Sequence, residues 1–141
     1  MKLKALIFII IAPLLATTLS ANEPERGAMA RAHGKRLTVK EWKTTPDGRN
    51  KWIDHIEVYN AEGYLIEERE YSDFGRRQAW RSEYSYNERG QLIQEVVYNE
   101  RNKIEKVRKF EYDADGVCTR RLNYNANGTL NSYRQFEYIY D

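Results

Sequence analysis

Apolar and polar residues alternate along most of the chain after Leu37, and short polar turns interrupt the alternation at regular intervals. Alternation with a period of two is the pattern of a β-strand with one face toward a core. The alternating segments are rich in Tyr, Val, Ile, Trp, Phe and Thr, which favour strands. We therefore expect an all-β domain with eight strands, near residues 37–43, 51–59, 64–71, 76–86, 91–98, 103–112, 117–124 and 129–140.

The turns belong to a repeated unit, Tyr-[Asn/Asp/Ser]-x-x-Gly-x-[Leu/Ile]. Its copies begin at Tyr59, Tyr71, Tyr86, Tyr98, Tyr112 and Tyr124. The Asn or Asp side chain of such a unit can hydrogen-bond the backbone two residues later, and glycine tolerates a positive φ angle. In the copy that begins at Tyr98, Asn102 stands in the glycine position. Each unit therefore predicts a chain reversal.

The spacing of the units predicts the architecture. Successive repeat tyrosines from Tyr59 to Tyr138 lie 12, 15, 12, 14, 12 and 14 residues apart, so the structural repeat is two strands of about 26 residues. Turns this short permit an antiparallel meander and exclude parallel crossovers, which need a dozen residues or more. We expect a strongly twisted or curled sheet, because charged residues such as Glu67 and Arg108 dilute the apolar face. Closure into a small barrel is the alternative.

The intervals within strands predict which residues share a face. In five strands the residue two positions after the turn glycine and the next repeat tyrosine are an even number of residues apart, as in Leu65 and Tyr71. An even interval predicts a shared face. The interval from Arg77 to Tyr86 is nine residues, an odd number. We therefore predict a β-bulge between Arg76 and Arg81, since one extra residue restores the register.

The first 21 residues have the pattern of a signal peptide: a basic start, an apolar run over Ala5–Leu15 and small residues up to Ala21. A retained membrane anchor is less favoured, because the run is shorter than the roughly 20 residues of a spanning helix and contains Pro13. We expect cleavage after Ala21 and a mature chain that does not span a membrane. Residues 22–36 are polar and lack periodicity, so we expect a mobile segment before a single β-repeat domain at 37–141.

Charge and cysteine content narrow the function classes. The net charge of +2 comes from Lys2 and Lys4, so the mature chain has 21 basic and 21 acidic residues. A nucleic-acid-binding surface needs a concentrated basic surplus, and we do not expect one. Cys118 is the only cysteine, which excludes an internal disulfide and offers no lipid-bearing cysteine near Ala21. We expect a periplasmic or extracellular protein.

The repeated unit resembles the tyrosine-aspartate (YD) repeat of the Rhs proteins, which also runs Tyr-Asp-x-x-Gly-x-Leu. The resemblance covers about Tyr59 to Asp141, more than half of the chain. The chain is also similar to uncharacterised small exported repeat proteins of bacteria, domains of unknown function. The resemblance implies a ribbon of β-hairpins that serves as a scaffold or binding surface, sometimes in contact with carbohydrate. With about six units and no toxin domain, this chain departs from the large Rhs proteins, so a role as an enclosing shell is not expected.

The residues that carry catalysis or bind metals are few. His33 and His55 have no partner at a motif spacing, and two histidines alone make a poor metal site. Cys118 lies on the predicted apolar face and is read as a small buried residue. The segment Asp113–Gly116 matches only the start of a calcium loop. We therefore expect no catalytic, cofactor-binding or metal-binding residues and no enzyme.

Aromatic residues are the strongest functional signal, with three tryptophans and eleven tyrosines in the chain. Exposed aromatic rings can anchor a protein partner or stack on sugars, although cross-strand packing is their more common role. The candidate surface residues are Trp42, Trp52, Trp80 and Tyr84, the last two beside the predicted bulge. We expect a binding or structural module at the cell envelope whose partner is a protein or envelope polymer.

Two further interactions are open from the sequence. The first is carbohydrate binding through the four candidate aromatic residues. The second is self-association, because strands 37–43 and 129–140 would form the two edges of the sheet and could pair with another chain.

Overall fold

The computed structural model describes residues 23–141, and the predicted signal peptide of residues 1–21 lies outside this part of the chain. One helix and eight strands follow in the order α1 (Glu23–His33), β1 (Leu37–Thr44), β2 (Lys51–Tyr59), β3 (Leu65–Ser72), β4 (Arg77–Tyr86), β5 (Leu92–Tyr98), β6 (Ile104–Tyr112), β7 (Cys118–Asn125) and β8 (Leu130–Gln135). Among the described residues, no helix has the length and apolarity needed to cross a membrane.

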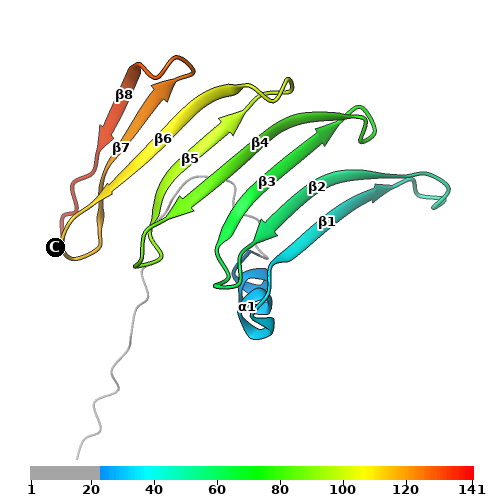
Figure 1. Ribbon diagram of the computed structural model, residues 1–141, viewed down its shortest axis with the longest axis horizontal. Coiled ribbons are helices and arrows are strands. Elements are labelled where there is room, and N and C mark those ends of the chain that lie inside the picture. Colours follow the sequence, from blue (N-terminus) through cyan, green and yellow to red (C-terminus); the bar gives the residue numbers. More distant parts are fainter. Residues whose placement is uncertain (1–22) are drawn as a thin grey trace, which may run out of the picture.

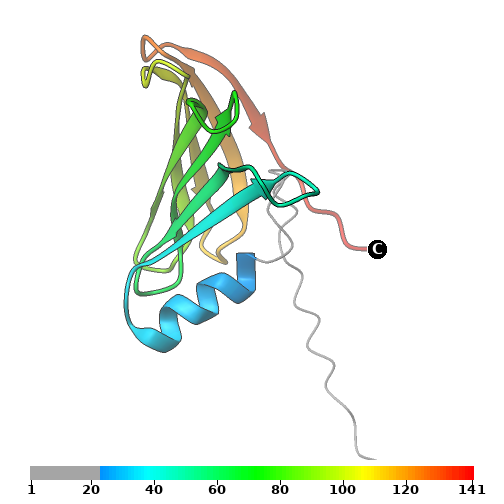
Figure 2. The ribbon, with the colours of Figure 1, turned by 90° about the vertical axis from the view of Figure 1, so that its right-hand side faces the viewer.

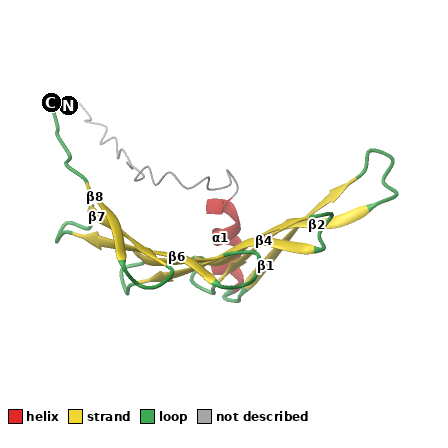
Figure 3. Cartoon of the chain, turned by 90° about the horizontal axis from the view of Figure 1, so that it is seen from above, coloured by secondary structure: helices red, strands yellow, loops and turns green. Residues whose placement is uncertain are grey.

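The eight strands form one sheet in sequence order, and every neighbouring pair is antiparallel (Figure 1). The predicted meander is therefore confirmed. The sheet is open rather than a closed barrel, because β1 and β8 are its two edges. Figures 2 and 3 show that it is curved and that α1 lies on the inner side of the curve. We call this inner side the concave face and the other side the convex face.

In five of the six copies the turn forms as the repeated unit predicts, whereas in the copy that begins at Tyr71 the N–H of Arg76 donates to the carbonyl of Asp73. In the β2–β3 turn, the N–H of Gly63 donates to the carbonyl of Asn60 over 3.0 Å, and the Asn60 side-chain oxygen accepts from the N–H of Tyr64 over 2.9 Å. Asn87, Asn99 and Asp113 hold their turns in the same way. Asn102 adopts a φ of 58°, so it takes the glycine conformation as predicted.

The strand ends agree with the expected ones to within one residue, except at β8. This strand ends at Gln135 instead of reaching residue 140. Residues 136–141 have no regular structure, although the N–H of Phe136 still donates to the carbonyl of Thr119 over 2.9 Å.

The predicted bulge is present. Glu70 pairs with Trp80 and Tyr71 pairs with Gln78, so Ala79 is an extra residue in β4. However, each of the other six strand pairs also contains a register shift, for instance at Ile66, which is skipped between the pairs of Tyr59 with Leu65 and Val58 with Glu67. Of these bulges, the one in β4 changes an interval from even to odd, and it is the one that the sequence predicts.

These additional bulges overturn the expectation of one shared face. In each of the five even intervals, a bulge lies between the residue after the turn and the next tyrosine, so the two residues lie on opposite faces. Tyr59, Tyr86 and Tyr112 therefore lie on the concave face, whereas Tyr71, Tyr98 and Tyr124 lie on the convex face. Successive repeat tyrosines thus alternate between the two faces, and this alternation accounts for a structural repeat of two strands.

The concave tyrosines form a ladder at the end of the sheet that α1 covers. The hydroxyl of Tyr86 donates to the carbonyl of Leu65 over 2.7 Å, and the hydroxyl of Tyr112 donates to the carbonyl of Leu92 over 2.7 Å. Tyr138 continues the series with a 2.8 Å bond to the carbonyl of Cys118. Each hydroxyl thus ties the end of one strand to the start of the strand before it.

The segment 22–36, expected to be mobile, instead contains the helix α1. Its ends fit helix chemistry, because Pro24 is favoured in a first turn and Gly34, with a φ of 59°, ends the last turn. The N–H of Gly34 donates to the carbonyl of Arg31. Ala30 of the helix packs against Tyr59 and Leu65, which are all at most 5% exposed. This contact supplies the burial that the polar sequence did not predict.

Candidate functional site

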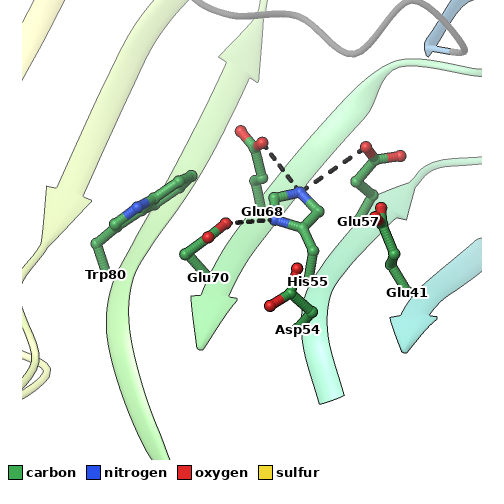
Figure 4. A pocket seen from close by; sticks show the side chains of 7 residues that line it. All are labelled: Glu41, Asp54, His55, Glu57, Glu68, Glu70 and Trp80. Carbon is green, nitrogen blue, oxygen red and sulfur yellow. Dashed lines mark hydrogen bonds and ion pairs between the residues drawn. The ribbon is translucent and has the colours of Figure 1, made fainter. Parts of the chain in front are cut away.

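Residues of strands β1 to β4 line a hollow on the concave face with a volume of about 230 Å³. We call it the acidic pocket. Five carboxylate side chains, one histidine and one tryptophan line it (Figure 4): Glu41, Asp54, His55, Glu57, Glu68, Glu70 and Trp80. Cross-strand pairing brings them together, since Glu41 and Glu70 both pair with His55, and Glu57 pairs with Glu68.

His55 lies at the centre of the acidic pocket. Its Nε2 is 3.1 Å from Oε1 of Glu68, and its Nδ1 is 2.9 Å from Oε2 of Glu70. The hydrogen bond to Glu68, followed by the one to Glu70, raises the pKa of His55 to about 9 against the opposing effect of burial. The imidazole is therefore protonated at neutral pH and donates from both nitrogens.

Glu57 is the most buried carboxylate of the pocket, with a side chain 4% exposed. Its Oε2 accepts a bond from Nη1 of Arg26 over 2.6 Å and another from the hydroxyl of Tyr59 over 2.8 Å. A buried charge is costly unless it is paired and hydrogen-bonded, and these two donors meet that need. The helix α1 thus contributes a cation to the wall of the pocket.

The polar network continues along the concave face beyond the pocket. The hydroxyl of Tyr84 donates to Oε2 of Glu68 over 2.8 Å, and burial, then the nearby Glu68 charge, raises the pKa of Tyr84 well above its usual value. Further on, Nη1 of Arg108 lies 2.5 Å from Oε2 of Glu95, which is 4% exposed. The concave face is therefore a polar band with apolar contacts near α1.

Negative charge is in excess around the pocket. Its five carboxylates face three cations: Arg26 at Glu57, Lys43 at Asp54 over 2.8 Å, and protonated His55. Glu41 and Glu70 are on the open side, and the Glu70 side chain is 39% exposed. This surplus favours a positively charged ligand. The Trp80 ring, whose centroid is 6.3 Å from that of His55, adds an aromatic wall.

The structure separates the four predicted aromatic candidates. Trp80 lines the acidic pocket. Tyr84 packs beside the core cluster of Ala30, Tyr59 and Leu65. Its hydroxyl donates a hydrogen bond to Glu68. Trp52 and Trp42 lie elsewhere, so the four do not form one surface.

Trp52 belongs to a second hollow near the β1–β2 turn, with a volume of about 540 Å³. Its ring meets that of Phe74 edge-on at 5.2 Å between centroids. Polar residues complete the lining: Thr45, Arg49, Asn50, Lys51 and Arg76. Trp42 is 46% exposed, and the Lys51 ammonium lies 4.6 Å from its ring centroid. Register alternation places Trp42 on the convex face.

Three other residues that the sequence singled out lie outside the acidic pocket: His33, Cys118 and Asp113. His33 lies in the last turn of α1 and is exposed. Cys118 is half-buried, and its Sγ lies 3.6 Å from the carbonyl oxygen of Arg120. Asp113 uses its side-chain oxygen to accept the N–H groups of Asp115 and Val117 within a turn.

Sequence reasoning missed the acidic pocket. It gave His55 no role and treated Arg26 as part of a mobile segment. Glu57, Glu68 and Glu70 could not be assigned to one face from the sequence, because their shared face depends on the bulge at Ile66. Without that bulge, the strand-to-strand pairing of charges cannot be assigned.

Comparison with known proteins adds little to this geometry. No protein-family model matches the chain, and no curated protein matches it. Among solved structures, TarM is similar over 75% of this chain and 18% of its own, with 10% identity and a TM-score of 0.32. A protein of unknown function from Bacteroides fragilis is similar over 74% of this chain and 96% of its own, with 12% identity and a TM-score of 0.25.

Proposed function

We propose that this chain is an exported, non-enzymatic binding module whose acidic pocket takes a positively charged segment of a protein partner at the cell envelope. The observation that carries the proposal is the convergence of five carboxylates on one hollow, against three cations from residues 23–141. An incoming ammonium or guanidinium group would complete this charge balance and could lie against Trp80.

The state of His55 supports binding rather than catalysis. A general base must be unprotonated near the working pH, and a pKa of about 9 keeps His55 protonated at neutral pH. Both ring nitrogens are also engaged by carboxylates, at 3.1 and 2.9 Å. His55 therefore serves to hold Glu68 and Glu70 in place. The resemblance of the repeats to YD repeats supports the same reading of the sheet as a scaffold.

Export is supported by the signal-peptide pattern of residues 1–21. Expression of the full chain in a bacterial host, followed by fractionation and N-terminal sequencing, tests it. We expect the protein in the periplasm or medium with Asn22 as its first residue. Retention in the cytoplasm with residues 1–21 intact would contradict export.

Binding is tested by calorimetric titration of the protein with a tetralysine peptide at low and high salt. We expect an affinity that weakens with salt, because the attraction is electrostatic. Glu70→Gln and Trp80→Ala should each bind the peptide more weakly than the wild type at the same salt concentration. Glu88→Gln, at an exposed turn, is the matched control and should bind like the wild type. Absence of binding, or equal affinity for all variants, would sink the proposal.

Carbohydrate binding is the second candidate, and the Trp52–Phe74 hollow favours it. An aromatic pair with amide and guanidinium neighbours offers both a stacking face and hydrogen-bond donors for a sugar. A glycan array compares the wild type with Trp52→Ala and Trp80→Ala. Binding that depends on Trp52 and not on Trp80 supports this candidate. A blank array, or binding that ignores Trp52, removes it.

A further inference from the structure

The two edges of the sheet differ from its interior in what they expose. Strand β8 is exposed along its whole length, and so are residues 136–141. This edge carries several large apolar side chains, each at least 39% exposed: Leu130, Tyr133, Phe136, Tyr138, Ile139 and Tyr140. An edge strand with exposed apolar side chains is a template for pairing with another strand.

The internal repeat indicates the register in which a further strand would add. At the α1 end of the sheet, each repeat tyrosine pairs with the first residue of the following strand, as Tyr59 does with Leu65 and Tyr112 with Cys118. Tyr138 is the next tyrosine of this series, and its hydroxyl already occupies the equivalent position on Cys118. The first residue of β1, Leu37, is the corresponding strand start at the opposite edge.

Placing Tyr138 of one molecule opposite Leu37 of a second copy gives complementary neighbours along both strands. In an antiparallel pair without a bulge, residue numbers increase on one strand as they decrease on the other. The concave face then receives Phe136 opposite Val39. The next concave pair is Arg134 opposite Glu41.

The convex face of the same pairing is complementary as well. Tyr133 would lie opposite Trp42, and both are exposed in the single chain, at 61% and 46%. An aromatic cross-strand pair of this kind stabilises a sheet. This register keeps the tyrosine-to-strand-start pairing of the repeat, and β1 keeps the bulge-free pairing that it has with β2 over Leu37–Glu41. It therefore also matches charge with charge and ring with ring.

Arg134 gives an independent reason for an acidic partner. Within the chain it pairs across the strands with Arg121, and like charges directly opposite each other are destabilising. Among residues 23–141, none forms an ion pair with Arg134. A carboxylate on a neighbouring strand would relieve this repulsion.

We propose that β8 of one molecule pairs antiparallel with β1 of a second copy, in the register that places Arg134 opposite Glu41. The contact joins different surfaces of the two copies, so it repeats and yields a ring where the rotation closes or a filament where it does not. This assembly does not depend on the ligand of the acidic pocket. Since Glu41 also lines that pocket, the tests rely mainly on β8.

Disulfide trapping tests the register. In a Cys118→Ser background, a chain with Tyr133→Cys and Trp42→Cys should give a ladder of linked multimers under a mild oxidant. The matched control carries Tyr133→Cys with Thr38→Cys, on the same face of β1 but roughly 13 Å further along the strand. It should give no ladder. Dimers from Tyr133→Cys alone would indicate β8–β8 pairing and overturn the proposal, as would the absence of a ladder from the first chain.

Charge reversal tests the same contact without new cysteines. In sedimentation velocity at rising concentration, we expect the wild type to assemble and Arg134→Glu to need at least roughly tenfold more protein, because two carboxylates would face each other. A mixture of Arg134→Glu and Glu41→Arg should assemble again with the two variants alternating, since each contact between unlike copies joins opposite charges. Arg101→Glu, the same change in an exposed turn, is the control. A wild type that stays monomeric, or an Arg134→Glu variant that assembles equally well, overturns the proposal.

Discussion

Nη1 of Arg26 lies 2.6 Å from Oε2 of Glu57, and this ion pair joins the helix α1 to the strand β2. The two side chains are 18% and 4% exposed, so the pair is largely shielded from water. Removing Arg26 would leave the buried Glu57 charge with only the Tyr59 hydroxyl at 2.8 Å and His55 Nε2 at 3.8 Å as partners among the described residues, and weakening a buried pair in this way is costly. We predict that Arg26→Ala lowers the free energy of unfolding at pH 7 by about 3 kcal/mol, measured by urea denaturation.

A second substitution separates charge from packing. Glu57→Gln in the Arg26→Ala background removes the buried charge that has lost its closest cation, and the variant should recover part of the lost stability. Lys35→Ala, at an exposed position just after α1, should change stability by less than about 0.5 kcal/mol. A loss no larger for Arg26→Ala than for Lys35→Ala would show that the pair does not hold the helix.

His55 predicts a stability that falls toward alkaline pH. The bond to Glu68, then that to Glu70, raises the folded-state pKa to about 9, above the usual 6.5. The protonated ring therefore stabilises the fold fully below about pH 6.5, and this contribution is lost as the pH rises through about 9. We expect the free energy of unfolding of the wild type at pH 6 to exceed that of His55→Gln by about 1 to 2 kcal/mol. Solvent screening at the open rim of the pocket keeps this difference small.

Urea unfolding of both proteins at pH 6, 8 and 10 checks this expectation, and an NMR titration of the imidazole gives its pKa directly. The difference between the two proteins should shrink as the pH rises. A difference that is constant over this range, or an imidazole that titrates near 6.5, would contradict the ion-pair cluster at His55.

The meander was predictable from the sequence because local chemistry alone determines its turns. In five of the six units, the Asn or Asp that follows the tyrosine and the glycine three residues later form the same reversal, with Asn102 in the glycine position of one of them. The distribution of residues between faces was not predictable, because it depends on a bulge in every strand pair. A bulge such as that at Ile66 leaves no mark in the sequence when the interval around it is even.

The helix and the pocket were missed for a related reason. Residues 22–36 were expected to be mobile because they are polar and lack periodicity, although Pro24 and Gly34 are of the types that mark the start and the end of a helix. What decides between the two interpretations is a tertiary contact, the burial of Ala30 against Tyr59. Arg26 acquires its role only through that docking, so the pocket wall could not be inferred from the strands alone.

The close approach of α1 to the β2–β3 turn makes Gly27 a sensitive position. A Cβ atom at Gly27 would lie 2.5 Å from the carbonyl oxygen of Gly63, which is backbone and cannot move aside cheaply. We therefore predict that Gly27→Ala destabilises the protein by about 1 to 3 kcal/mol, although alanine is the better helix former by about 1 kcal/mol.

Hydrogen exchange of the α1 amides and urea unfolding measure this effect. Ala28→Gly, at an exposed position of the same helix, is the control and should cost only the helix propensity, about 1 kcal/mol. Faster exchange in Gly27→Ala than in wild type supports the close contact. Slower exchange, as propensity alone would give, would rule it out.

The repeated turns offer a matched pair of glycines that separates backbone strain from packing. Gly90 and Gly128 occupy the same position in their units and have φ angles of 74° and 82°, so alanine is strained equally at both. A Cβ at Gly128 meets no atom of residues 23–141 within 4 Å, whereas one at Gly90 would overlap the hydroxyl oxygen of Tyr64. Tyr64 stacks on Tyr86 with 4.9 Å between ring centroids, and yielding to the new methyl group would break this stack.

We predict that Gly90→Ala costs about 1 kcal/mol more than Gly128→Ala in urea unfolding, the value of a stacked aromatic pair. Repeating both substitutions in a Tyr64→Ala background should make the two costs equal. If the gap persists without the Tyr64 ring, it does not arise from the stack.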